Sequence, residues 1–232
     1  MTNFKDLDIL KIFTKIEGIL INETPLRIGV GREGPIGSPI DLSVYRVNGI
    51  PCIPGSSLKG VFRSFVESIA SSKGYRVHQP WDNQIIEDEA KNNNFCIICG
   101  IFGSGELASH VKIYDSTPLK NSDGRTFMKT GIGIDREFGS VRPGHLFTEE
   151  FVIPKTKWTF RMDLYNISLF PEPEDERGKL LRTLLDTLTS IGLSIGARKS
   201  AGCGLIKLLE AKWETYSIID GTFKLKESGV LR

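Results

Sequence analysis

The stretch IPGSSLKGVFRSFVESI, residues 53–69, places a glycine, two serines and a lysine at the start of an apolar stripe. Pro54 prevents an earlier helix start, and Ser56 or Ser57 is expected to cap the first turn by accepting a backbone N–H bond. Apolar residues then recur at helical spacing, which predicts a helix over residues 56–72 with one buried face. Its apolar positions are Leu58, Val61, Phe62, Phe65, Val66 and Ile69.

The same helix start has a second interpretation. Its free backbone amides, its serine hydroxyls and the side chains of Lys59 and Arg63 form a surface suited to phosphate, because the N-terminus of a helix attracts negative charge. The alternative is an ordinary helix N-terminus with solvated charges. This stretch alone favours the ordinary N-terminus, so evidence for phosphate binding has to come from other segments of the chain.

The residues around this helix predict an α+β fold. Alternating apolar and polar residues predict strands over residues 9–22, 109–115, 157–167 and 204–213. A second helix follows the acidic sequence PEPEDERG and ends before Gly192. Its expected core face is Leu180, Leu181, Leu184, Leu185, Leu188 and Ile191. The order of strand, helix, strand, strand, helix and strand is the ferredoxin-like, or RRM-like, arrangement.

Two segments interrupt this arrangement. Residues 74–106 carry an acidic, Asn-rich sequence and a pair of cysteines, and residues 118–156 read as a long β-hairpin. Because both segments return to the same series of elements, we expect one domain over residues 1–232 rather than two. The Gly/Pro-rich residues 27–39 are expected to form a loop.

Composition indicates an ordinary globular protein. The chain has 232 residues, of which 40% are hydrophobic and 25% charged, and its net charge is +2. We find no apolar run of about 18 residues and no signal-peptide pattern, so we expect a cytoplasmic protein without a membrane partner. With so small a net charge, binding of nucleic acid requires basic groups concentrated on one surface.

A glycine-rich segment near the C-terminus is the strongest local signal of a phosphate ligand. The sequence IGLSIGARKSAGCGLIK, residues 191–207, contains Arg198 and Lys199 among several glycines and no acidic residue. Glycines such as Gly196 and Gly202 let backbone amides approach a phosphodiester chain, because they lack a Cβ atom. The alternative is a tight connection between a helix and a strand. The segment lacks the Gly-Lys-Ser/Thr order of a Walker loop.

The cysteine pair indicates either a metal site or an apolar turn. Cys96 and Cys99 have the spacing of metal ligands, and His78 lies upstream in the same segment. Cys52 and His110 are both candidates for a fourth ligand. The alternative is that the two cysteines are small apolar residues in a buried turn. Cys203 is expected to serve packing, and His145 to be a surface histidine.

Four segments in order resemble the RAMP superfamily of CRISPR-associated proteins: IPGSSLKGVFR, CIICGIFGS, the hairpin sequence from GIGIDREFG to RMDL, and IGARKSAGCGLIKL. The likeness runs from about Phe13 to Trp213 and is greatest to the backbone subunit of type III complexes of the Csm type. It implies a modified RRM-like domain. The aromatic signature of ordinary RRMs is missing, so base stacking on the sheet is not expected.

The resemblance implies that the chain grips the phosphates of a guide RNA (crRNA) and leaves base pairing to select the target RNA. Other type III subunits and copies of the chain itself, stacked head to tail, are the implied partners. The candidate RNA-binding residues are Ser56, Ser57, Lys59, Arg63, Lys129, Arg136, Arg142, Gly196, Arg198, Lys199 and Gly202. Some similar proteins hold a structural zinc in the cysteine segment, which points to His78, Cys96 and Cys99.

The resemblance also implies a candidate catalytic residue. Similar backbone subunits have an aspartate, required for cutting target RNA, shortly before a Gly-Leu/Ile-Pro sequence, and Asp41 matches that place. Its carboxylate is expected to hold a divalent metal such as magnesium or to orient the attacking 2′-hydroxyl. The match departs from the family, because Asp41-Leu42-Ser43 stands where Asp-Ser-Pro is usual. A loop carboxylate making a local turn bond is the alternative.

Three functions therefore stay open. The first is a metal-dependent endoribonuclease that also binds guide RNA in the complex, and the second is an RNA-binding backbone subunit without catalysis. The third is a stand-alone crRNA-processing endoribonuclease, which we rank lower because such enzymes are expected to use a histidine-led site. The chain has three histidines, none of them next to the glycine-rich segment in sequence.

Overall fold

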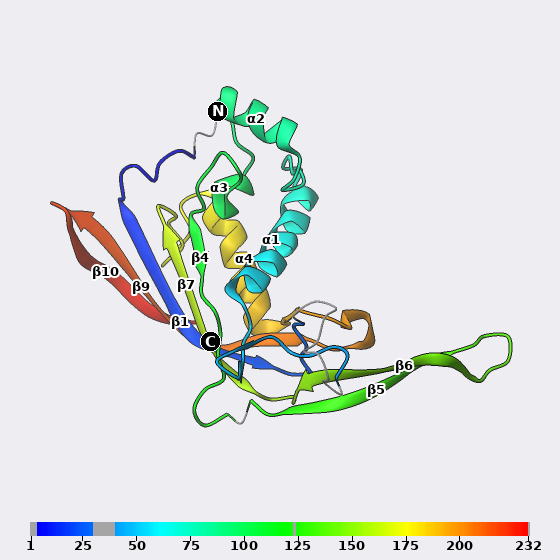
Figure 1. Cartoon of the computed structure of the whole chain (residues 1–232). Helices are drawn as coiled ribbons and strands as arrows, with labels where there is room; N and C mark the ends of the chain where they lie inside the picture. The colour runs from blue at the N-terminus through cyan, green and yellow to red at the C-terminus, as the bar shows by residue number, and fades with distance from the viewer. Residues whose placement is uncertain (1–3, 30–39, 123, 232) are drawn as a thin grey trace.

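A computed structural model describes residues 4–29, 40–122 and 124–231. Its main sheet has the strand order β10-β9-β1-β7-β4, and β8 (Leu193–Ser194) also pairs with β9. The central strands are β1 (Ile12–Asn22), β7 (Lys157–Tyr165) and β9 (Leu205–Ile219). The strands at the two edges are β10 (Thr222–Leu231) and the short β4 (Val111–Ile113), and all neighbouring strands are antiparallel. The fold is thus a mixed α+β structure around a curled antiparallel sheet (Figure 1).

Two helices, α1 (Gly55–Ser72) and α4 (Glu176–Ser190), cover one face of this sheet (Figure 1). The core between them and the sheet includes Ile16 and Leu20 of β1 and Phe62 of α1, all fully buried. Each such side chain contributes about 2 kcal/mol by leaving water. Because side chains alternate along a strand, Phe13 and Lys15 lie on the opposite face, with Glu17 and Ile19.

The start of α1 differs from the prediction. The helix begins at Gly55, one residue earlier than expected, and neither serine caps it. Instead the Gly55 amide donates a hydrogen bond of 2.8 Å to the carboxylate of Asp115, a residue distant in sequence. A Cβ atom at residue 55 would lie 2.3 Å from the carbonyl oxygen of Ile113, so only glycine allows the helix to pack this closely on β4. β4 covers only Val111–Ile113 of the predicted residues 109–115.

The second predicted helix is confirmed as α4, with one error. Asp175 caps it by accepting a hydrogen bond of 2.8 Å from the Gly178 amide, and all five predicted leucines are buried. Ile191 was wrongly placed in the core. It follows the last helical residue and is 70% exposed, because the chain turns at Gly192, whose φ is +89°. An apolar residue beyond the last turn no longer shares the buried stripe.

The C-terminal strands extend beyond the prediction. β9 continues to Ile219, six residues past the expected end, and turns into the unpredicted β10. Asp220 and Gly221 join the two strands, both with positive φ. Asp-Gly between apolar segments is a strong signal of a two-residue hairpin turn, so the sequence does contain the information needed to predict β10.

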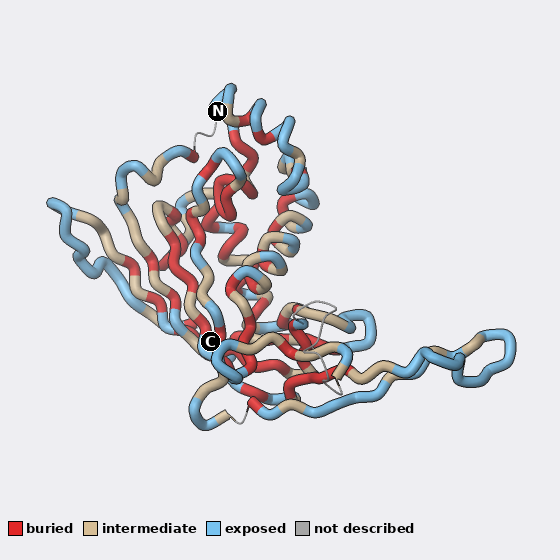
Figure 2. The backbone as a smooth tube through the Cα atoms, viewed as in Figure 1, coloured by how far each residue is buried: buried red, intermediate tan, exposed pale blue. Residues whose placement is uncertain are grey.

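The remaining elements lie in the two interrupting segments and beside β6. Residues 74–106 contain α2 (Asn83–Lys91) and α3 (Cys99–Phe102), while β5 (Thr126–Ile134) and β6 (Val141–Val152) form the predicted hairpin. The hairpin reaches away from the sheet, and exposure rises toward its tip (Figure 2). A small pair, β2 (Arg46–Val47) and β3 (Ile50–Pro51), and a 3-10 turn η1 (Lys199–Ala201) complete the fold. In the described part of the chain, no helix is long and apolar enough to cross a lipid bilayer.

Candidate nucleic-acid interface and metal centre

A groove of about 520 Å³ separates α1 from the glycine-rich segment. One side of α1 lines it with three serines, a glycine and two apolar residues, and the segment from β8 to η1 lines the opposite wall. The lining residues are Ser57, Gly60, Val61, Ser64, Phe65, Ser68, Leu193, Ser194, Ile195, Gly196 and Lys199. The structure therefore brings Ser57 together with Gly196 and Lys199, as expected for one surface. Ser56 is exposed in the first turn of the same helix but does not line the groove.

Two glycines allow the backbone conformation of the glycine-rich segment beside this groove. Gly196 has φ +83°, and a Cβ atom there would lie 2.2 Å from the carbonyl oxygen of Arg27. Gly204 has φ +82°, and its Cβ would lie 1.9 Å from the carbonyl oxygen of Ile195. Gly202 also has a positive φ, without a nearby atom. Side chains at residues 196 and 204 are therefore excluded both by conformation and by space.

The side chains of Lys199 and Arg198 differ in whether their charges have a partner. Arg198 donates from Nε to both carboxylate oxygens of Glu149, at 2.9 and 3.2 Å, and its guanidinium stacks over Phe147. The buried Glu149 also pairs with the buried Arg27 at 2.9 Å. Lys199 is exposed and has no side-chain partner among the described residues. Lys199 is thus the cation of this segment that is open to a ligand, whereas Arg198 mainly joins the segment to β6.

The structure does not bring Lys59 and Arg63 to this groove. Lys59 donates a hydrogen bond of 3.0 Å to the hydroxyl of Ser109. Arg63 pairs with Glu67 at 2.8 Å and donates to the carbonyl of Gly103 at 3.0 Å. Residues two apart on a helix point about 200° away from each other, so Lys59 lies opposite Ser57. The predicted phosphate surface at the start of α1 is thus split between two sides of the helix.

The hairpin carries the other three predicted cations, all of them exposed. Lys129 of β5 lies opposite Glu149 of β6 and lines a small cavity of about 200 Å³ together with Arg198. Arg136 lies in the turn after β5, and Arg142 lies at the beginning of β6. Lys129 is therefore near the base of the hairpin, next to the glycine-rich segment, while the two arginines are near its tip.

Asp41 lies beside the hairpin rather than in a local turn. Its Oδ2 accepts a hydrogen bond of 2.6 Å from the Thr148 amide of β6, 107 residues away. Its own amide donates to the Thr148 carbonyl at 3.2 Å, and the side chain is exposed. Within the described residues, Asp41 belongs to no cluster of His, Cys, Asp or Glu ligands. Much of the preceding loop, residues 30–39, lies outside the described residues.

The segment after Asp41 is held to β6 by Glu150. This buried carboxylate accepts hydrogen bonds from the Val44 amide at 3.0 Å and from Arg46 at 2.8 Å. Hydrogen bonding from Arg46 lowers the pKa of Glu150 to about 2, so the carboxylate stays ionised at neutral pH. The path of the chain around Asp41 is thereby fixed against the hairpin.

His78, Cys96 and Cys99 meet in a buried cluster, as predicted for metal ligands, and Glu89 of α2 completes it. One ligand atom from each residue lies within 4.8 Å of the other three. The His78 Nε2 atom is 3.4 Å from Cys99 Sγ and 3.3 Å from Glu89 Oε2. Two thiols, one imidazole and one carboxylate form a four-donor set suited to tetrahedral zinc.

Neighbouring groups orient the donors of this cluster. His78 Nδ1 lies 3.0 Å from the carbonyl of Gln79, which leaves Nε2 for a metal, and Arg76 holds Glu89 Oε1 at 2.6 Å. Such outer contacts are typical of metal sites. Hydrogen bonding from Cys99 lowers the pKa of the Cys96 thiol, whereas the same contact and burial raise the pKa of Cys99, so Cys96 is the thiol that ionises first. The residues thus fit a zinc ion.

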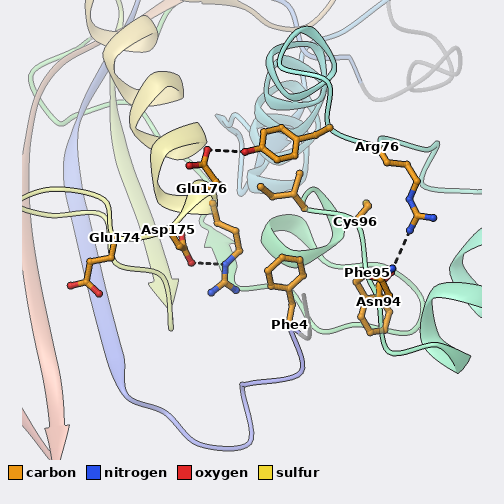
Figure 3. A pocket seen from close by; sticks show the side chains of 11 residues that line it. Phe4, Arg76, Asn94, Phe95, Cys96, Glu174, Asp175 and Glu176 are labelled. Carbon is orange, nitrogen blue, oxygen red and sulfur yellow. Dashed lines mark hydrogen bonds and ion pairs between the residues drawn. The ribbon is translucent and has the colours of Figure 1, made fainter. Parts of the chain in front are cut away.

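A cavity of about 540 Å³ borders the cluster, and Figure 3 shows it from close by. Cys96 and Phe95 form part of its wall, and on the same side Arg76 donates to the carbonyl of Asn94 at 3.3 Å. On the other side the chain at the start of α4 contributes Glu174, Asp175 and Glu176. Asp175 pairs with Arg177 at 3.0 Å, and Glu176 accepts a hydrogen bond of 2.8 Å from the Tyr75 hydroxyl.

Neither of the two fourth ligands considered from sequence belongs to the cluster. Within the described residues, His110 is buried with Nε2 2.5 Å from Asp6, and Cys52 is buried outside the group. Glu89 was missed because a glutamate on a polar helix carries no sequence signal of metal binding. Its burial, unusual for a glutamate, is visible only in the structure. None of the three histidines lines the groove beside α1.

The open face of the sheet carries an aromatic group that was not anticipated. The Phe13 ring lies 5.3 Å from Tyr165, 6.1 Å from Tyr216 and 5.8 Å from Phe223, measured between ring centroids. Beside these rings, Lys15 pairs with Glu17 and Glu214. The charges next to the rings therefore include carboxylates, which do not attract phosphate.

The family model of the RAMP superfamily matches residues 20–207. The chain therefore belongs to the RAMP superfamily. Among solved structures it resembles a chain of the type III-B Cmr-beta complex bound to cognate target RNA, with a TM-score of 0.57 and 18% identity. The match covers 95% of this chain but 61% of that chain, so this protein spans less than two thirds of its relative. A search of curated proteins found no match.

Proposed function

We propose that the protein is a guide-RNA-binding subunit of a type III CRISPR effector complex. The observation that carries this proposal is the groove beside α1, where Ser57, Gly196 and the unpaired Lys199 present small groups and a free cation. Such a surface suits a phosphodiester chain and offers no base-specific contacts. Membership of the RAMP superfamily and the likeness to a chain of a complex bound to target RNA support it.

The order of elements supports a modified ferredoxin-like, RRM-like unit as the scaffold of this function. Along the chain, β1, α1, β4, β7, α4 and β9 follow the βαββαβ order, and in the sheet they lie as β9-β1-β7-β4. Residues 74–106 then form an insertion between α1 and β4, and residues 118–156 form one between β4 and β7. In this proposal residues 1–232 make a single domain.

We also propose that copies of the chain stack head to tail along the RNA, beside other type III subunits. A head-to-tail contact joins two different surfaces and does not close on itself, so it builds a filament. The hairpin is the element suited to reach a neighbouring copy. Its distal half exposes Ile132, Ile134 and Leu146 at 48%, 63% and 66%.

Cleavage of the bound target RNA is the finer proposal, and it rests on Asp41. The Oδ2 atom bonds Thr148, and the exposed side chain leaves Oδ1 to hold a magnesium ion or to position the 2′-hydroxyl that attacks the adjacent phosphate. The bond to Thr148 also favours the alternative of a backbone subunit without catalysis, in which Asp41 only ties the loop to the hairpin.

Lys199→Ala is expected to weaken RNA binding severalfold and to a similar degree for unrelated single-stranded sequences. Loss of one phosphate contact should reduce the slope of log affinity against log salt by about 0.7. The measurement is fluorescence anisotropy across a salt series. Lys199 is changed alone, because Arg198 also pairs with the buried Glu149.

Lys226→Ala on β10 is the matched control, since it removes an exposed lysine away from the groove. An effect of Lys199→Ala on one RNA sequence only would contradict binding of the RNA phosphate backbone in this groove. Equal binding by the wild type and Lys199→Ala would contradict it as well.

Asp41→Asn is expected to abolish cleavage of target RNA in the assembled complex, with assembly intact. Asparagine can still accept the bond from Thr148 but lacks the charge that holds a metal. The measurement is single-turnover cleavage with magnesium. If Asp41→Asn cleaves normally while Asp41→Ala fails to assemble, Asp41 is structural and the alternative holds.

A further inference from the structure

A second cationic cavity lies at the free edge of β4, on the side of α1 opposite the groove. It encloses about 530 Å³, and none of its lining residues is acidic. The lining residues are Leu7, Leu10, Lys59, Ser109, Val111, Lys112, Ile113 and Tyr165. A cavity of this volume is in the size range of small-molecule sites, and apolar walls with a few polar groups are typical of them.

The Lys59 ammonium is held in place inside this cavity. Its Nζ donates to the Ser109 hydroxyl at 3.0 Å, and that hydroxyl donates in turn to the Val111 carbonyl at 2.7 Å. The serine is thereby oriented by the backbone of β4. An ammonium has three N–H groups, so two remain for a ligand.

Lys59 also lacks a counter-charge. Within the described residues it has no ion-pair partner, and the charge that acts on it is that of another cation, Arg63. Burial, followed by Arg63, lowers the pKa of Lys59. A partly buried charge without a partner is costly, and a bound anion removes that cost.

We propose that this cavity binds a free organic phosphate of mononucleotide size, which goes beyond the proposed binding of guide RNA. The two open N–H groups of Lys59 match the oxygens of a phosphate ester, and Lys112, whose ammonium lies 5.3 Å from the centroid of the Tyr114 ring, adds positive charge to the same lining. The aliphatic side chains of Leu7 and Leu10 match a flat base. The site is separate from the groove that contains Lys199.

The test is isothermal titration of the purified full chain with AMP and UMP, with adenosine as the uncharged comparison. Binding of a nucleotide at submillimolar concentration is expected, with adenosine at least tenfold weaker. Lys59→Met keeps the aliphatic stem and should weaken nucleotide binding at least tenfold, whereas Lys226→Met, which changes an exposed lysine of β10, should leave it unchanged. Ser109→Ala, which removes the bond that positions the ammonium, should weaken it as well.

Several results would overturn the proposal. They are absence of nucleotide binding at millimolar concentration, equal binding of adenosine, or unchanged binding by a folded Lys59→Met variant. Displacement of AMP from the wild type by a short single-stranded RNA would place the cavity on the RNA surface and overturn a separate site. Failure of guide-RNA binding by the wild type would contradict the proposed function, but the titration with nucleotides would still test this cavity.

Discussion

The protein purified from zinc-supplemented cells is expected to contain about one zinc ion per chain, and chelation is expected to lower its melting temperature strongly. The four donors from His78, Glu89, Cys96 and Cys99 are all buried and already lie close together. Structural zinc sites in small domains have apparent binding free energies of about 10–16 kcal/mol, which become folding free energy. The measurements are elemental analysis and thermal unfolding with and without a chelator.

Cys99→Ser should reduce both the zinc content and the melting temperature, because it removes a thiolate ligand. Glu89→Gln should weaken zinc binding without abolishing it, since His78 and the two thiols remain. Cys52→Ser is the matched control, as Cys52 is equally buried and lies outside the cluster. Metal-free protein of undiminished stability would instead show that the two cysteines are ordinary apolar residues of a buried turn.

Glu149→Ala is expected to lower the free energy of unfolding by about 3–5 kcal/mol, as for the loss of one partner from a buried ion pair. Glu149 is 5% exposed, and its carboxylate bonds both Arg27 and Arg198. The Arg27 guanidinium is buried too, and its Nε already lacks a hydrogen-bond partner. Without Glu149 it becomes an unpaired buried charge. Urea unfolding followed by circular dichroism measures the change.

Glu17→Ala is the matched control, because Glu17 pairs with Lys15 and Arg161 on the exposed face of the sheet. Exposed pairs of this kind contribute at most about 1 kcal/mol. A loss for Glu149→Ala no larger than that for Glu17→Ala would mean that Arg27 finds water or another partner, against the role assigned to the buried pair.

Local patterns predicted α1, α4 and the central strands well, but not α2 and α3. The leucines of α4 and its acidic first turn identify that helix, and the apolar stripe after Pro54 identifies α1. The Asp-Gly signal before β10 was present in the sequence and was missed. Ile191 was wrong because a spacing rule does not show where the chain leaves the helix, which here is set by Gly192.

The candidate site was less predictable, because it depends on pairs that are distant in sequence. Cys96 and Cys99 are close along the chain and were found, whereas Glu89 needed the packing of α2 to be recognised. Arg198 was read as a free cation because its partner Glu149 lies 49 residues away. Lys59 was grouped with the glycine-rich segment but lies on the other side of α1, because sequence alone does not show which face of the helix meets that segment.

The two halves of the hairpin formed by β5 and β6 differ in their free energy of folding. Near its base, Phe151 and Val152 are buried, so folding of the main sheet fixes that half. Toward the tip, Phe138 is 76% exposed, and the two strands pair with each other without a buried core. A two-stranded ribbon without a core is marginally stable in water. Its distal half therefore retains conformational entropy in the free subunit, and whatever first covers these apolar side chains must supply the free energy that orders it.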